Sequence, residues 1–224
     1  MKRKIFSILF ALVLVVSFSL VTAVPVAANT DRLVPSEYAT IQAAIDDADP
    51  GDTIIVAAGT YSEWQDVSAF GTGKSTGIMI DKSLIVVSVD GAEVTIIDAL
   101  EADMGVLING EDTVATFDGF TVDNYDTAGI LAGAFGYWGE DPVEVHILNN
   151  IVMPPTIEPP HNNNIQVGDG TTGTIIGNEV SGAFLESGDW SGSGILVAGS
   201  SNVLVSNNYV HDCEGGIQIQ GYAE

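Results

Sequence analysis

A short strand phrase repeats near the end of the 224-residue chain and constrains its fold more than any other feature. Gly194-Ile195-x-Val197 recurs as Gly216-Ile217-x-Ile219, and Asn207-Asn208 lies at the turn between them. Degraded copies of the phrase begin at Gly77, Gly105, Gly129 and Asn164. A repeat of roughly 22–35 residues that is built from strands rather than helices indicates a solenoid.

Many short strands are also typical of a β-sandwich, in which antiparallel strands alternate in polarity and are joined by tight hairpins. Here one turn recurs instead. Asn149-Asn150, Gly177-Asn178 and Asn207-Asn208 each precede a similar short strand that contains Val. Asn tolerates the left-handed backbone conformation, and stacked Asn side chains can hydrogen-bond from coil to coil. The pattern therefore predicts an all-β fold, a single-stranded parallel β-helix.

One segment alone has a convincing helical period. In the segment Ser36–Ala48, apolar residues recur at i, i+3, i+4 and i+7, counted from Ile41. Thr40 can cap the start of this helix, and Pro50-Gly51 ends it. We expect this helix to cover the open end of the first coil, which would otherwise expose apolar interior and unpaired backbone. The strands that we predict are Thr53–Ala57, Ile78–Ile80, Leu84–Val89, Val94–Ile97, Val106–Ile108, Ala115–Val122, Ile130–Ala132, Val143–Leu148, Ile165–Val167, Thr174–Ile176, Ile195–Val197, Val203–Val205 and Ile217–Ile219.

The segments Tyr38–Ala48 and Pro50–Glu63 resemble the opening of the pectin-lyase-like right-handed β-helix proteins. This group includes pectin methylesterases, relatives of pectate lyases, NosD-like periplasmic proteins and many surface proteins. The resemblance runs through residues 33–224 and implies a right-handed parallel β-helix with an N-terminal capping helix. It implies no particular activity, because the opening motif is an end cap with a first coil and carries no catalytic residue.

The first 28 residues resemble a secretory signal peptide. Lys2, Arg3 and Lys4 precede an apolar run from Ile5 to Val21, and Val26-Ala27-Ala28 suits a signal peptidase. The alternative is an uncleaved membrane anchor, because seventeen apolar residues almost span a bilayer. We expect a secreted, extracellular or cell-surface protein with a β-helix domain at 29–224. No cap follows the last strand phrase, so we expect that domain to be C-terminally incomplete.

Net charge excludes one class of partner. Removal of residues 1–28 leaves three strong cations and 30 acids, a net charge of 3 − 30, or −27. No basic patch remains to bind nucleic acid. We expect membrane contact only through an uncleaved signal or a C-terminal anchor beyond residue 224. The acidity indicates either a saline or divalent-rich exterior, where salt screens self-repulsion, or solubility alone.

Catalysis on polysaccharides is the alternative to a binding role. A polysaccharide lyase needs an Arg or Lys base and cations, but Arg32, Lys74 and Lys82 all precede the central coils. Pectin methylesterase relatives need an Arg on the coils, and none follows Arg32. A polysaccharide hydrolase needs only two or three neighbouring carboxylates. The candidates are Asp123, Asp126, Glu140, Asp141, Asp169, Glu186, Asp189 and Asp212.

Two insertions between coils carry the predicted binding residues. Tyr137 and Trp138 lie beside Glu140 and Asp141 in one insertion, and in the other Trp190 lies beside the carboxylates Glu186 and Asp189. Aromatic rings can stack on sugars while the acids accept hydroxyl hydrogen bonds or bind Ca²⁺. The alternative is that the tryptophans pack against the coil.

Metal binding is only weakly indicated. The spacing of metal ligands is missing among the histidines His146, His161 and His211. Acidic turns such as Asp46–Asp52 and Asp118–Asp126 could bind Ca²⁺, and the alternative is that their carboxylates are only solvated. Cys213 has no partner for a disulfide and suits a buried or turn-lining position. We therefore predict a non-catalytic surface module that contacts a polysaccharide or cell-surface glycan, with a fragment of a polysaccharide hydrolase or lyase as the alternative and Ca²⁺ as the one cofactor to consider.

Overall fold

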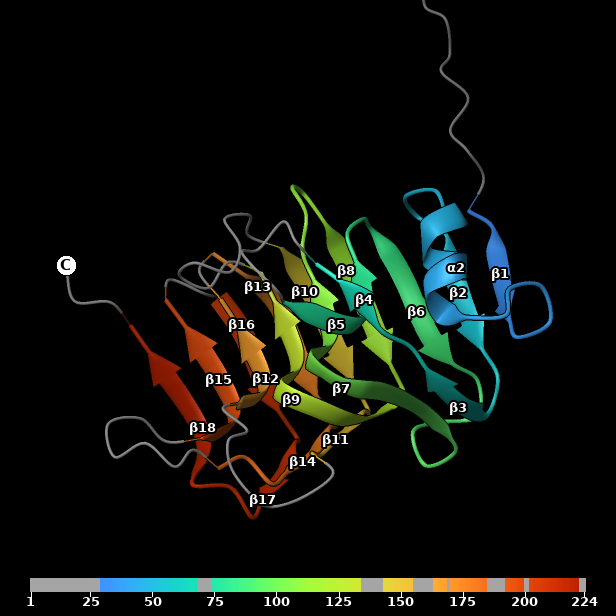
Figure 1. Cartoon of the computed structure of the whole chain (residues 1–224). Coiled ribbons are helices and arrows are strands. Elements are labelled where there is room, and N and C mark those ends of the chain that lie inside the picture. The colour runs from blue at the N-terminus through green and yellow to red at the C-terminus, as the bar shows by residue number, and fades with distance from the viewer. Residues whose placement is uncertain are drawn as a thin grey trace, which may run out of the picture.

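A computed structural model describes residues 29–67, 74–133, 143–154, 163–168, 170–184, 192–199 and 202–221. In these ranges the chain winds through stacked coils, from blue at the N-terminal end to red at the C-terminal end (Figure 1). Neighbouring coils pair through parallel strands on three faces, and the two-residue strand β4 pairs antiparallel with β5. The predicted parallel β-helix is confirmed.

The first face is a seven-stranded sheet. It consists of β1 (Asp31–Val34), β2 (Thr53–Val56), β6 (Leu84–Ser88), β8 (Val114–Asp118), β10 (Glu144–Leu148), β13 (Thr172–Ile176) and β16 (Asn202–Ser206). The second face holds the short strands β3 (Gly59–Ser62), β11 (Ile151–Val152), β14 (Glu179–Ser181) and β17 (Tyr209–His211). The third holds β4 (Gln65–Asp66), β5 (Ser75–Ile80), β12 (Asn163–Val167), β15 (Ser193–Ala198) and β18 (Gly215–Gln220). β7 (Thr95–Ile108) and β9 (Thr121–Ala132) run through both the second and the third face.

The repeated strand phrases lie in register on the third face. Each apolar residue after the Gly or Asn pairs with its counterpart in the next coil. The ladder runs through Ile78, Val106, Ile130, Ile165, Ile195 and Ile217. The alignment of repeats made from the sequence is therefore confirmed residue by residue.

Three strand predictions were wrong in their bounds. The predicted strand Ala115–Val122 is divided, because Gly119 adopts a φ of 83° and turns the chain from the first face into the second. The predicted strands Val94–Ile97 and Val106–Ile108 belong to one bent strand, β7, whose register shifts between Asp98 and Met104. Sequence periodicity does not reveal a bend inside a continuous strand.

The core is a column of side chains that stack from coil to coil. On the first face Ile54, Val86, Phe117, Ile147 and Ile175 pair in register, and all five are fully buried. Burial of such a side chain contributes about 1.5–3 kcal/mol. Repetition of the same inward position in every coil is what makes the interior continuous.

Asn side chains join the coils at the turn from the first face into the second. The side-chain oxygen of Asn178 accepts from the backbone N–H and the amide of Asn150, at 2.9 and 3.1 Å. Asn208 accepts in the same way from Asn178, at 2.9 Å for both bonds. The residue before each of these, Asn149, Gly177 or Asn207, has a positive φ. The predicted coil-to-coil Asn stack is confirmed, and we call it the Asn-ladder turn.

The ladder begins one coil earlier on an aromatic residue. Phe120 occupies the equivalent position, and its backbone N–H donates to Asn150 at 2.9 Å. The Phe120 ring stacks on Phe117, with 4.6 Å between centroids. The Phe120 ring fills the interior at this position, and the Phe120 backbone N–H still bonds to the first Asn of the ladder.

Helix α2 (Ile41–Asp47) covers the N-terminal end of the coil, as predicted (Figure 1). Its inward residues Ile41, Ala44 and Ile45 are buried in the core. Thr40 caps its start by accepting from the Ala43 N–H at 3.1 Å, and the buried Glu63 carboxylate accepts from the Ile41 and Gln42 N–H groups at 2.6 and 2.9 Å.

The helix also closes the edge of the third face. The side-chain oxygen of Gln42 accepts from the backbone N–H of Met79 at 2.8 Å, and its amide donates to the Met79 carbonyl at 3.3 Å. The Gln42 amide thus takes the place of a missing neighbouring strand beside β5. Such satisfaction of an open edge prevents pairing with another chain.

Candidate functional site

The seven residues predicted to bind carbohydrate lie outside the described residues. They are Tyr137, Trp138, Glu140, Asp141, Glu186, Asp189 and Trp190. The described residues locate only their attachment points. One insertion leaves β9 after Gly133 and returns at Val143, and the other lies between Phe184 and Gly192. Both are thus attached at ends of the third face, and whether they bind sugar stays a prediction.

Within the described residues, polar and aromatic side chains gather at the corner where the second face turns into the third. We call this the acidic corner and define it by Ser62, Trp64, Asp98, Leu100, Asp123 and Asn124. Asp98 of β7 pairs in register with Asp123 of β9, and Ser62 of β3 pairs with Asp98. Neighbouring strands lie about 4.8 Å apart, so three successive coils present these side chains side by side.

Asp98 is a fixed hydrogen-bond acceptor in this corner. One oxygen accepts from the Asn124 amide at 2.7 Å and from the Leu100 N–H at 3.1 Å, and the other accepts from the Ser62 hydroxyl at 2.9 Å. Burial by itself raises the pKa of Asp98, but these hydrogen bonds outweigh it and leave the pKa below its usual range. The carboxylate is therefore held ionised and oriented.

Asp123 has the opposite tendency. Partial burial raises the pKa of Asp123 above its usual range, and the charge of Asp98 raises it further, against the 2.6 Å hydrogen bond from the Asn124 N–H. Neighbouring carboxyl groups whose pKa values are pushed apart are the pattern of an acid and base pair. Of the carboxylates named from the sequence, Asp123 and Asp126 lie on β9, and Asp126 is exposed. Asp212 lies three coils further on.

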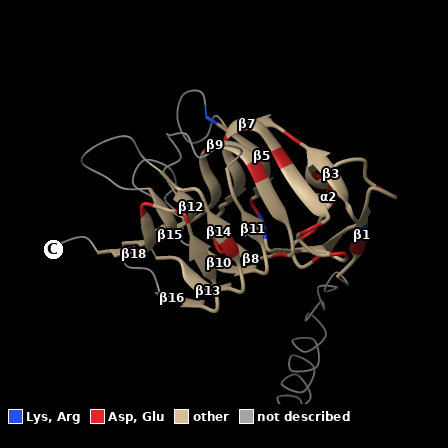
Figure 2. Cartoon of the chain, turned by 90° about the horizontal axis from the view of Figure 1, so that it is seen from below, with Lys and Arg blue, Asp and Glu red and all other residues tan. Residues whose placement is uncertain are grey.

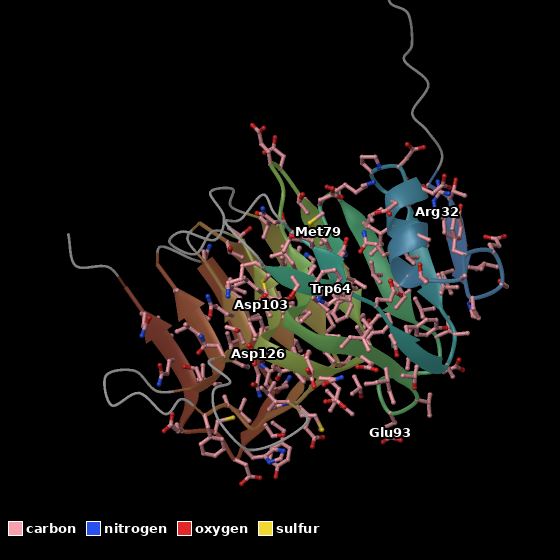
Figure 3. All side chains as sticks on the ribbon, viewed as in Figure 1. Arg32, Trp64, Met79, Glu93, Asp103 and Asp126 are labelled. Atoms are coloured by element: carbon pink, nitrogen blue, oxygen red, sulfur yellow. The ribbon has the colours of Figure 1, made fainter. Side chains whose placement is uncertain are left out.

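The aromatic residue of this corner was missed from the sequence. Trp64 follows β3 and is 55% exposed, and Leu100 on the next coil is 48% exposed. Figure 3 places Trp64, Asp103 and Asp126 on the same side of the coil. Asp98 was missed as well. The available signal was the run Glu63-Trp64-Gln65-Asp66, an aromatic among polar residues directly after a strand.

The three strong cations that follow the N-terminal segment are all engaged in the structure. Arg32 pairs with Asp47, and with Asp52 at 3.0 Å, and Lys74 pairs with Asp103 at 2.5 Å. Lys82 donates to the carbonyls of Ile45, Asp46 and Ala48 at the end of α2, at 3.2–3.3 Å. None of them lies in the acidic corner as defined above. The described residues therefore offer it no Arg or Lys as a lyase base.

Histidine and cysteine do not form a metal centre in the described ranges. His146 contacts Thr174 Oγ1 at 2.9 Å, while His211 contacts Asp212 at 2.8 Å on another face. His161 lies outside the described residues. Cys213 is half-buried, and burial raises the pKa of its thiol. No group of three His, Cys, Asp or Glu residues in the described part of the chain is arranged to hold a metal ion.

The outer side of the third face changes character along the coils. In the early coils Met79, Leu107 and Leu131 form an apolar row. Further along, Gln166 occupies the same row, and the amide of Asn163 donates to it at 2.7 Å. Ser193 pairs with Asn163, and its hydroxyl is buried without a partner. Asn163, Gln166 and Ser193 are all buried, and the apolar Leu196 follows Gln166 in the row, so these polar groups do not form an open surface.

Comparison with protein families identifies the repeat. Residues 143–224 match the family model described as "Right handed beta helix region". With the parallel pairing on three faces, the match decides the handedness. The fold is a right-handed parallel β-helix. Comparisons with curated proteins and with solved structures return no match. The β-helix supports many different functions, so the match names a fold and no substrate.

In the parts of the β-helix that the structure describes, no helix has the length and apolar character needed to cross a membrane.

Proposed function

We propose that this β-helix is an extracellular or cell-surface module that binds polysaccharide along the acidic corner. The observation that carries the proposal is Trp64, which is 55% exposed and lies two residues after Ser62, whose hydroxyl donates to the fixed Asp98 carboxylate. An aromatic face stacks on the apolar face of a sugar ring, and fixed acceptors receive its hydroxyl groups.

The position of one insertion supports the same corner. The segment that carries Trp190 is attached where the second face turns into the third, between β14 and β15, whereas the segment that carries Trp138 is attached at the opposite end of the third face, after β9. Glycan binding through these segments forms part of the proposal. Secretion, which we infer from residues 1–28, would place the surface where such polymers occur.

Charge favours neutral or amine-bearing sugars over uronates. The corner holds Asp98 and Asp123, and the strong cations of the β-helix coils are engaged elsewhere. A polymer of uronic acids would be repelled by these carboxylates. Neutral hydroxyl groups, by contrast, can donate to them.

Binding to a glycan array tests this role. We expect Trp64→Ala to weaken binding by about tenfold or more, the loss of roughly 1.4 kcal/mol. Tyr209→Ala is the matched control, because Tyr209 is 63% exposed but lies on β17, coils away from the corner. Equal binding by Trp64→Ala and the parent protein, or no glycan binding at all, would contradict the proposal.

Glycoside hydrolysis is a second candidate, favoured by the split pKa values of Asp98 and Asp123. Carboxyl groups about 5–5.5 Å apart suit a retaining glycosidase, and register neighbours on adjacent strands lie at about this spacing. In this role Asp123 is the acid and Asp98 the nucleophile. Release of reducing ends from neutral polysaccharides, lost in both Asp98→Asn and Asp123→Asn, would establish it. Binding without turnover would leave only the first role.

A further inference from the structure

Trp64, on which the proposed glycan binding rests, lies between two residues that both contact the capping helix. Glu63 precedes it, and the Glu63 carboxylate accepts from the Ile41 and Gln42 N–H groups of α2. Gln65 follows it, and the Gln65 amide donates to the side-chain oxygen of Gln42 at 2.6 Å. Both neighbours of the tryptophan are therefore held by the same helix. We call Glu63, Gln65 and Gln42 the α2 clamp.

The clamp is fixed in turn to the third face. The Gln42 side chain bonds to the N–H and the carbonyl of Met79 on β5, and its amide also donates to Asp46 at 2.8 Å, one turn further along α2. Strand β4, which contains Gln65, pairs antiparallel with β5. The segment that carries Trp64 is thus attached to β3 on one side and to the edge of β5 on the other, and α2 bridges the two.

The clamp is buried where the ring is not. Glu63 is 7% exposed, whereas more than half of Trp64 is exposed. An exposed side chain loses conformational freedom when a ligand binds it, and a surrounding structure that is already rigid reduces this cost. Residues that fix the backbone on both sides of Trp64 therefore favour its stacking on a sugar.

We propose that the α2 clamp positions Trp64 and makes glycan binding depend on pH, because protonation of Glu63 loosens the tryptophan. This inference rests on the proposed function of the acidic corner. An ionised carboxylate accepts through both oxygens, whereas a protonated one carries an O–H donor. On protonation, one N–H at the start of α2 loses its full acceptor. Glu63 acts through Trp64 and is therefore a positioning residue.

The surroundings of Glu63 favour its proton. Burial raises the pKa of Glu63 above its usual value, against the two N–H hydrogen bonds, and the charge of Asp46 on α2 raises it further. Burial also raises the pKa of Tyr61 on β3, and the charge of Glu63 adds to that shift. On β7, the Asp98 backbone carbonyl accepts from the Glu63 N–H at 3.1 Å, and β5 has no titratable residue. Basic residues are few (Figure 2), and the three strong cations of the coils bond elsewhere.

Protonation of Glu63 does not by itself unfold the protein. Because the pKa of Glu63 is raised on folding, the folded chain takes up this proton more readily than the unfolded chain. The stability linked to Glu63 is present below the unfolded pKa of about 4.3 and is lost as pH rises through the folded pKa. A loss of glycan binding in acid that depends on Glu63 is therefore local.

Fluorescence anisotropy of Trp64 tests the clamp without any ligand. The chain has three tryptophans, so Trp138→Phe and Trp190→Phe leave Trp64 as the one that emits. Circular dichroism first establishes that each variant is folded. We expect lower anisotropy in Glu63→Gln and in Gln65→Ala at neutral pH, because each removes one attachment of the segment to α2. The parent should show the same fall as the pH is lowered.

Affinity for a neutral hexasaccharide selected on the glycan array, measured over the same pH range, tests the effect on binding. We expect Glu63→Gln to weaken binding roughly three- to tenfold at neutral pH, the effect of about one hydrogen bond, and to flatten the fall in acid. Asp123→Asn should keep that fall. Glu37→Gln is the matched control, because the exposed Glu37 carboxylate also accepts from a backbone N–H, that of Leu33, at 3.1 Å.

Lower anisotropy and weaker binding in Glu63→Gln, with neither change in Glu37→Gln, support the proposal. Unchanged anisotropy in both Glu63→Gln and Gln65→Ala overturns it, whether or not a glycan binds. A fall of affinity in acid that Glu63→Gln retains in full overturns the pH dependence. If the parent binds no glycan while both clamp variants lower the anisotropy, the proposed function is wrong and the positioning of Trp64 by α2 is supported.

Discussion

At the Asn-ladder turn, three successive coils use the same arrangement: a left-handed residue followed by an inward Asn. At the acidic corner the chain changes from coil to coil, from Trp64 to Leu100 to Asn124, and the last two have a positive φ. The ladder turns its polar groups inward, where each bonds to the next coil. The corner turns them outward. The repeated Asn turn therefore stabilises the fold. Residues at the acidic corner can differ from coil to coil, and such residues can serve a function.

The largest expected effect breaks the ladder. Asn178→Ala removes bonds to Asn150, Asn208 and the Ile147 carbonyl, and leaves buried donors without partners. We expect a loss of about 3–5 kcal/mol, because each unsatisfied buried group costs about 1–3 kcal/mol. Denaturant unfolding measures it. Asn202→Ala, an exposed position on β16, is the control and should change stability by less than about 0.5 kcal/mol.

A loss below about 1 kcal/mol in Asn178→Ala would show that the coils stack without the ladder.

The next effect concerns the glycines that follow the acidic corner. A Cβ on Gly105 would overlap Val122 of the second face and lie 2.6 Å from the Gly129 carbonyl oxygen. We expect Gly105→Ala to cost about 1–3 kcal/mol through overpacking. Gly216→Ala occupies the same ladder row but has nothing within 4 Å, so thermal unfolding of the two variants isolates the packing. Similar stabilities in both would refute the explanation.

A smaller effect on the pH dependence of stability distinguishes Asp98 from Asp123. The pKa of Asp98 is lowered on folding, so its stabilisation is present above the unfolded pKa near 3.9 and is lost as pH falls through the folded pKa. Asp98→Asn should cost about 1 kcal/mol at pH 7 and flatten the acid limb of the stability curve. Exposure to solvent keeps the effect modest.

Asp123→Asn should behave in the opposite way. The pKa of Asp123 is raised on folding, so the folded state favours its proton, and stability is lost as pH rises from the unfolded pKa through the folded one. Removal of this charge should leave stability at pH 7 equal or slightly higher. Urea unfolding between pH 3 and 8 compares the two variants, and destabilisation of both by the same amount would contradict the assignment.

The smallest expected effect is on stability in Trp64→Ala. Because the ring is largely exposed, its loss should change the free energy of unfolding by less than about 0.5 kcal/mol while glycan binding falls. A large loss of stability would mean that the ring packs against the coil and that the corner is structural. Differential scanning calorimetry is sufficient to decide this.

Most of the fold could be predicted, because each coil repeats a local pattern. The Gly-Ile phrases gave the register of the third face, and paired Asn residues gave the ladder. The cap at Ile41–Asp47 followed from its helical period and from Thr40. Bends within β7 and the break at Gly119 were missed, because they depend on where the chain must turn a corner rather than on periodicity.

The candidate site could be predicted much less well. Carboxylates are so numerous that sequence alone does not say which two meet, and Asp98 lies 25 residues before Asp123. Their pairing follows from the length of one coil, which the structure supplies through register. Trp64 was missed because its exposure depends on the neighbouring coils rather than on its own segment.

By itself, the sequence determined that this protein is a parallel β-helix with a helical cap, since inward positions recur with the length of a coil and the cap has its own period. Only the tertiary structure decided which outward side chains become neighbours. Residues about 30 apart in sequence lie side by side across adjacent strands, and small differences in coil length choose the partners. That choice created the acidic corner.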